Sequence, residues 1–213
     1  MATDKVPPTT GQLRRLNRIV YEVPIVGTAP LITNRWSEKA RQMMLDKQQS
    51  SARAKKEAKD PEALFEAAHY KLPDGRNGMP ATAFKAAIVH AARLFEGITQ
   101  VSLKQMVRVL GELDDRGEQI IPITCDEVIM REDTPRNASG VADLRYRPQF
   151  NGWRAVLPVQ IVEGQLDEAS LLALVDAAGI GGVGEMRPTA PKSATGQYGT
   201  FEVDETAFIG VAG

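Results

Sequence analysis

Alternating apolar and polar positions predict the strands of this chain. The alternation is clearest over residues 16–26 and 150–162, and shorter alternating runs cover residues 119–124 and 198–203. Successive side chains of a strand point to opposite faces of a sheet, so a period of two predicts a strand with one buried face. Residues 102–110 also alternate in part, and we predict a further strand there.

A helical period marks two longer segments. In residues 81–95 the side chains of Phe84, Ile88 and Phe95 fall on one face, and residues 166–178 repeat the pattern with leucines. Apolar residues three and four positions apart line one side of a helix, so both segments are predicted as amphipathic helices that cover a core.

Two shorter helices are predicted between the first strand and residue 70. Asp60 followed by Pro61 is typical of a helix start, with Asp as the cap and Pro in the first turn. Residues 36–49 also have a helical composition, and residues 50–59 are polar and rich in lysine without an apolar stripe.

The order of these elements predicts an α+β fold. Strand, helix, strand pair, helix and strand follow one another, which is the β-α-β-β-α-β order of ferredoxin-like proteins and of RNA-recognition modules. The length of 213 residues fits one domain, residues 1–213. Two stretches have no counterpart in such a core, and we predict insertions over about residues 36–78 and 125–148.

The composition excludes several classes of protein. The chain is 43% hydrophobic and 25% charged, as in ordinary globular proteins, and has no apolar run long enough for a membrane span. Its first residues lack the apolar region of a signal peptide, and Cys125 has no second cysteine to pair with, so we expect a cytoplasmic protein. One cysteine and two histidines offer no zinc site, and we predict neither metal nor cofactor.

Charge is unevenly distributed along the chain. Residues 1–110 carry 18 Lys and Arg against 10 Asp and Glu, whereas residues 111–213 carry 8 against 17. A basic half provides an electrostatic surface for nucleic acid. The alternatives are a dipolar surface and complementary faces of neighbouring subunits, and the latter would favour head-to-tail assembly.

A glycine-rich stretch lies near the C-terminus. Gly179, Gly181 and Gly184 form a GxGxxG pattern, but they follow a helix and precede the last strand. A dinucleotide-binding fingerprint instead follows a strand and opens a helix, so that function is not indicated. Two interpretations stay open, a helix cap at Gly179 with a plain connection, and a loop that faces a ligand.

Three segments together resemble the RAMP superfamily of CRISPR-associated proteins. They are a Pro-Leu turn after the first strand (residues 29–32), a helix entered through Pro80 with Lys85 one turn later, and the glycine stretch before the last strand. The chain also resembles small RAMP-like proteins of phage and prophage genomes. The resemblance implies a ferredoxin-like core with a thumb-like insertion, and a subunit that binds single-stranded RNA and assembles as a filament.

Candidate binding residues follow from these patterns and from the resemblance. Arg35 with Trp36 suits base stacking beside a phosphate contact, and Lys85 at a helix start suits an anion. Each candidate also has a structural interpretation. For Trp36 it is a core residue, for Lys85 a solvated side chain, and for Arg187, which follows the glycine stretch, a salt bridge to Glu185 or to another local acid. The predicted nucleic-acid contacts are Arg35, Trp36, Arg53, Lys55, Lys56, Lys59, Lys85, Gly181, Gly182, Gly184 and Arg187.

We therefore expect a sequence-independent binding module for single-stranded RNA, or for DNA, that associates with copies of itself. Three alternatives remain at this point. One is a metal-dependent endoribonuclease that uses Asp46, Asp60 or Asp74. The second is a phage protein that only binds proteins or mimics a CRISPR subunit, and the third is a DNA-annealing protein. No nucleophile and base stand at a recognisable spacing, and we predict no catalytic residue.

Overall fold

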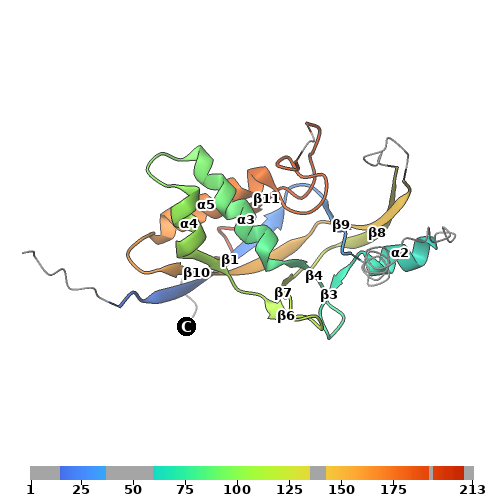
Figure 1. Ribbon diagram of the computed structural model, residues 1–213, viewed down its shortest axis with the longest axis horizontal. Coiled ribbons are helices and arrows are strands. Elements are labelled where there is room, and N and C mark those ends of the chain that lie inside the picture. Colours follow the sequence, from blue (N-terminus) through green and yellow to red (C-terminus); the bar gives the residue numbers. More distant parts are fainter. Residues whose placement is uncertain (1–14, 37–59, 135–142, 192–193, 209–213) are drawn as a thin grey trace, which may run out of the picture.

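A computed structural model describes residues 15–36, 60–134, 143–191 and 194–208, and its elements form an α+β arrangement (Figure 1). The strands are β1 (Arg18–Gly27), β2 (Leu31–Ile32), β3 (Tyr70–Lys71), β4 (Asn77–Pro80), β5 (Val107–Val109), β6 (Glu112–Leu113), β7 (Gln119–Pro122), β8 (Glu127–Asp133), β9 (Arg145–Asn151), β10 (Arg154–Val162) and β11 (Phe201–Val203). The helices are α2 (Pro61–Ala67), α3 (Ala81–Ala91), the 3₁₀ turn η1 (Ala92–Leu94), α4 (Gln100–Met106) and α5 (Glu168–Gly181).

Four strands form the main sheet in the order β11-β1-β10-β5, and every neighbouring pair is antiparallel. The long pair β1–β10 runs from Arg18 opposite Val162 to Val26 opposite Arg154. Helices α3 and α5 pack against each other and cover one face of this sheet (Figure 1). The strands predicted from the alternation of residues 16–26 and 119–124 are present. The run over residues 150–162 is divided by a turn at Gly152, with residues 150–151 in β9 and the rest of the strand in β10, and the run over residues 198–203 is limited to β11.

The core lies between the main sheet and the two helices. Val23 of β1 and Leu157 of β10 are fully buried and face each other across the strand pair. Phe84 and Ile88 of α3 are buried on the sheet side, as the helical period predicts. Trp153 is fully buried as well, and its indole nitrogen donates to the carbonyl of Ala29 at 2.9 Å.

Smaller sheets extend the molecule away from the main sheet. One has the order β3-β4-β7-β6, and the other has the order β2-β9-β8. Strands β8 and β9 pair from Glu127 opposite Asn151 to Asp133 opposite Arg145, and they project away from the covering helices (Figure 1). The polar middle segment of the sequence therefore includes a β-hairpin.

Two predicted boundaries were wrong. Residues 100–106 form helix α4, and only Val107–Val109 extend as a strand. The helix begins at a capping box in which Thr99 and Ser102 bond to each other's backbone, a local signal that competes with the alternation. Helix α3 ends at Ala91, so Phe95 lies beyond it and is 39% exposed.

The second long helix also differs from its prediction. It continues to Gly181, three residues past the predicted end, and Gly182 is its C-cap with a φ of 68°. Gly179 is thus inside the helix, where a Cβ would stand 1.7 Å from the carbonyl oxygen of Phe201. Its lack of a side chain allows α5 to lie directly on β11, and it does not cap the helix.

No helix within the described residues is long and apolar enough to span a membrane.

Candidate nucleic-acid interface

A cleft of about 180 Å³ lies beside helix α3, and we call it the α3 cleft. Five parts of the chain line it: the residues that follow β2, the strand β3, Met79 of β4, one side of α3, and the segment that follows α5. The lining includes Asn34, Tyr70, Ala86, His90, Gly182, Glu185 and Arg187. The cleft thus brings together α3, the glycine segment and residues 33–34, which directly follow the Pro-Leu turn of residues 29–32.

Close backbone contacts explain the glycines of this cleft. Gly182 and Gly184 have φ values of 68° and 79°, which favour glycine. A Cβ on Gly184 would be 2.5 Å from the carbonyl oxygen of Ile32. The amide of Glu185 donates to that same carbonyl at 2.8 Å, so the segment after α5 is bonded to the end of β2.

Gly181 differs from these two glycines. It is the last residue of α5, and its carbonyl accepts bonds from the amide and the hydroxyl of Thr189, at 3.2 and 2.8 Å. It does not line the α3 cleft, so only Gly182 and Gly184 of the three predicted glycine contacts do so.

Arg187 lines the cleft and makes a short-range contact. Its Nη1 donates to the carbonyl of Gly184 at 2.8 Å. The alternative of a salt bridge to Glu185 is not formed, because the Glu185 carboxylate lies 3.7 Å from Nη2 of Arg147. A guanidinium has five N–H donors, and the bond to Gly184 uses one of them.

Lys85 lies away from the cleft. The cleft is lined by Ala83, Ala86 and His90, whereas Lys85 points to the other side of α3 and donates to the carbonyl of Lys104 at 3.2 Å. Successive side chains of an α-helix are rotated by about 100° around its axis, so Lys85 lies on a different side of α3 from the lining side chains. Lys85 therefore does not line the cleft with the glycine segment, and its contact with nucleic acid stays a prediction.

Arg35 and Trp36 follow β2 in the chain and lie in different environments. Arg35 lies over the ring of Tyr70 at 5.3 Å and pairs with the buried Asp114 and, at 3.4 Å, with Glu118. The two carboxylates balance most of the charge of Arg35, so its main effect is to hold in place the Tyr70 ring and the segment that follows β2. Trp36 is 60% exposed and is not the core residue of the alternative interpretation.

The main sheet itself has no aromatic surface for stacking. The aromatic side chains of its described strands, Tyr21 and Phe201, are buried on the helix side. RNA-recognition modules stack bases on aromatic side chains of the open sheet face. Among the described aromatic side chains, Trp36 and Phe95 are exposed and offer a ring for stacking, and Tyr70 lines the cleft.

Asp114 gives the Arg35 cluster a pH dependence. Burial raises the pKa of this carboxyl, but bonds from the amides of Glu118 and Arg116 and from Arg35 outweigh it, so the pKa is lowered. A lowered folded pKa stabilises the protein above the unfolded value, about 3.9, and the gain is lost as the pH falls through the folded value.

We therefore expect Asp114→Asn to cost about 1–2 kcal/mol near neutral pH and progressively less in acid. Urea unfolding of both proteins from neutral pH to about pH 3 measures the difference. Asp126→Asn is the control, because Asp126 makes an exposed pair with Arg154 that contributes little. A deficit for Asp114→Asn that persists undiminished below the folded pKa would contradict this account.

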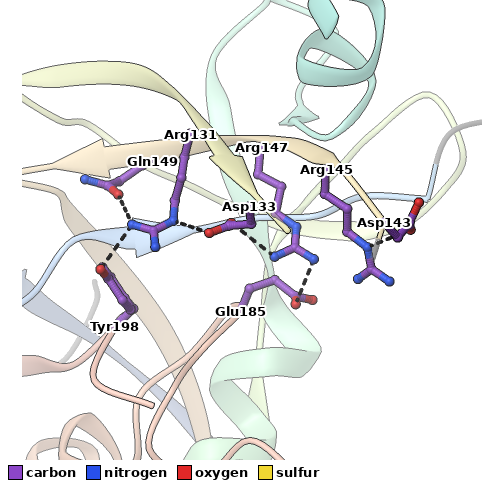
Figure 2. A network of polar contacts seen from close by, with 8 residues as sticks. All are labelled: Arg131, Asp133, Asp143, Arg145, Arg147, Gln149, Glu185 and Tyr198. Atoms are coloured by element: carbon purple, nitrogen blue, oxygen red, sulfur yellow. Dashed lines mark hydrogen bonds and ion pairs between the residues drawn. The ribbon is translucent and has the colours of Figure 1, made fainter. Parts of the chain in front are cut away.

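A polar network joins the β8–β9 hairpin to the segment that follows α5 (Figure 2). Arg131 donates to Asp133 at 2.8 Å and to the hydroxyl of Tyr198 at 3.1 Å, and it lies over the Tyr198 ring. Arg147 reaches Asp133 on one side and Glu185 on the other, at 3.5 and 3.7 Å. Glu185 thus belongs both to this network and to the cleft.

Sequence reasoning did not single out Asn34, Tyr70 and His90 as residues of the cleft. Asn34 follows β2 and Tyr70 lies in β3, and no motif surrounds either residue; the pairing of these strands with other segments places them. His90 is exposed and lines the cleft from α3. Burial lowers the pKa of the other histidine, His69, whose Nδ1 lies 2.9 Å from the carbonyl of Phe65.

Two of the remaining candidates have other contacts, and the rest lie outside the described residues. Arg53, Lys55, Lys56 and Lys59 lie outside the described residues, as do Asp46 and most of the helix predicted over residues 36–49. Asp60 caps α2, as predicted, by accepting from the amides of Glu62 and Ala63. Asp74 accepts from the backbone and side chain of Arg76 in a turn.

Within residues 15–36, 60–134, 143–191 and 194–208, no three side chains of the metal-binding types lie together. No protein-family model matches the chain, and a search of curated proteins finds no match.

Proposed function

We propose that this protein is a binding module for single-stranded nucleic acid, with RNA as the preferred ligand, and that the α3 cleft and Trp36 form its binding surface. The observation that carries the proposal is the convergence of three segments distant in sequence, the exit of β2, the helix α3 and the residues Gly182–Arg187, on one cleft. The helix and the glycine residues belong to segments that resemble the RAMP superfamily, and the exit of β2 directly follows the third such segment, the Pro-Leu turn of residues 29–32.

We further propose that the core is ferredoxin-like. In chain order β1, α3, β5, β10, α5 and β11 follow the pattern β-α-β-β-α-β. The sheet order β11-β1-β10-β5 and the packing of α3 and α5 on one face support this assignment. The remaining strands and α2 are then insertions, and the β8–β9 hairpin corresponds to the thumb-like one.

Binding in this proposal combines stacking with hydrogen bonds. Trp36 offers an exposed ring on which a base stacks, and Arg187 offers guanidinium donors to the bound strand. Assembly of copies head to tail is part of the proposal and rests on the opposite charges of the two halves of the chain.

The test is the fluorescence anisotropy of labelled single-stranded RNA and DNA, titrated with the protein over a range of salt concentrations. We expect salt-sensitive binding that Trp36→Ala weakens roughly tenfold, since stacking of one base contributes about 1–3 kcal/mol. Arg187→Ala should weaken binding as well, because it removes guanidinium donors from the cleft.

Two matched variants serve as controls for this experiment. Leu94→Ala removes another exposed apolar side chain, and Lys85→Ala removes a cation on the far side of α3. Both should retain binding. The absence of salt-sensitive binding to either strand type at low salt would refute the proposal and leave a role in protein interaction. Acceleration of the pairing of complementary DNA strands would favour annealing instead.

A further inference from the structure

We infer that the α3 cleft holds an unstacked nucleobase of the bound strand and not a phosphate of its backbone. The inference rests on the proposed function and adds the chemical group that occupies the cleft.

The charges of the cleft argue against a phosphate. Its lining contains one carboxylate, Glu185, and one guanidinium, Arg187, so the formal charges of the lining side chains sum to zero. Gly182 is the C-cap of α5, so a helix C-terminus with its partial negative charge ends at the cleft. The first turn of α3, which includes Ala83, also lines the cleft, and a helix N-terminus carries a partial positive charge. The partial charges of the two helix ends therefore offset each other. A phosphate would find no net positive charge in this cleft.

The shape of the cleft suits a flat, mostly apolar group. The lining includes Ala83, Ala86 and Ala87 of α3, whose side chains are methyl groups, together with Gly182 and Val183. Drug-sized ligands require clefts of about 300–1,000 Å³, so a volume of about 180 Å³ suits a smaller group.

Polar groups at the edge of the cleft match the edges of a base. The Glu185 carboxylate accepts hydrogen bonds, Arg187 donates them, and the Asn34 amide does both. Guanine presents N–H donors beside its O6 acceptor, so its edge can bond to a carboxylate and a guanidinium together. Burial raises the pKa of Tyr70 and keeps its phenol neutral, which suits a ring in contact with a base.

The test compares two strands of abasic sugar–phosphate units, one of which carries a single guanine at its centre. We expect the guanine strand to bind roughly tenfold tighter, because burial and stacking of one base contribute about 1–3 kcal/mol. Ala86→Leu fills the cleft from an exposed helix position that tolerates leucine, and it should bring the guanine strand to the affinity of the abasic one. Ala173→Leu makes the same change at an exposed position of α5 and should alter neither affinity.

Three results would overturn the inference, and they differ in what they say of the proposed function. Equal binding of both strands leaves nucleic-acid binding intact but removes the base from the cleft. Guanosine monophosphate that binds as tightly as the strand would make the cleft a site for free nucleotides. Binding of neither strand, at any salt concentration, would refute the proposed function and the inference together.

Discussion

Gly179→Ala is expected to destabilise the protein by about 3 kcal/mol, although alanine is ordinarily the better helix residue. The added Cβ would stand 1.7 Å from the carbonyl oxygen of Phe201 and 3.0 Å from its ring. A backbone oxygen held in a sheet cannot turn away as a side chain can, so α5 must move off β11. Overpacking of a core costs about 1–3 kcal/mol, and this contact is closer than most. Thermal or urea unfolding measures the loss.

Gly181→Ala provides the matched control, two residues further along the same helix. There the Cβ would meet the methyl group of the exposed Thr189 side chain at 3.0 Å, and that side chain can shift. Because alanine gains up to about 1 kcal/mol over glycine in a helix, this variant should be neutral or slightly more stable. Equal stability of Gly179→Ala and Gly181→Ala would contradict the close packing of α5 on β11.

Arg147→Met is expected to cost about 3 kcal/mol. The Arg147 side chain is 3% exposed and lies between Asp133, which is 7% exposed, and Glu185. Removal of one partner from a buried ion pair costs about 3–5 kcal/mol, because the remaining charge stays buried. The lower end applies here because Asp133 keeps its bond to Arg131 (Figure 2). Denaturant unfolding gives the free-energy change.

A neighbouring arginine and a second substitution check the mechanism. Arg145 lies two residues away in β9 and pairs with Asp143 at the surface, so Arg145→Met should change stability by less than about 1 kcal/mol. Addition of Asp133→Asn to Arg147→Met removes the stranded carboxylate and should recover part of the loss. If the two arginine variants are equally stable, burial of the Arg147 charge has no energetic consequence.

Arg147 also determines how firmly the segment after α5 is attached to the hairpin. Burial lowers the pKa of its guanidinium, and none of the described residues accepts a bond from its Nε. Its attraction to Glu185 offsets part of this cost by Coulombic interaction. Because Glu185 also lines the α3 cleft, the hairpin and the cleft share one carboxylate. Unfolding and binding should therefore be measured on the same Arg147→Met protein.

The sequence by itself determined the elements that depend on local periodicity. The alternation over residues 16–26 and 150–162 predicted β1 and β10, since a half-buried strand requires a period of two. The apolar face of residues 81–91 predicted α3, and Asp60 with Pro61 predicted the start of α2. Where two local signals competed, as in residues 100–109, the pattern could not decide between the capping box of α4 and the alternation of β5.

Only the tertiary structure decided the role of the glycines and the composition of the cleft. Gly179 and Gly184 lie beside carbonyls of Phe201 and Ile32, and these contacts arise from the packing of segments far apart in the chain. Glu185 could pair with its neighbour Arg187 by sequence, yet it pairs with Arg147 because β9 brings a buried guanidinium to it. Local propensity is set by a few neighbouring residues, whereas a binding cleft is set by which distant surfaces meet, and a single sequence carries no direct record of that.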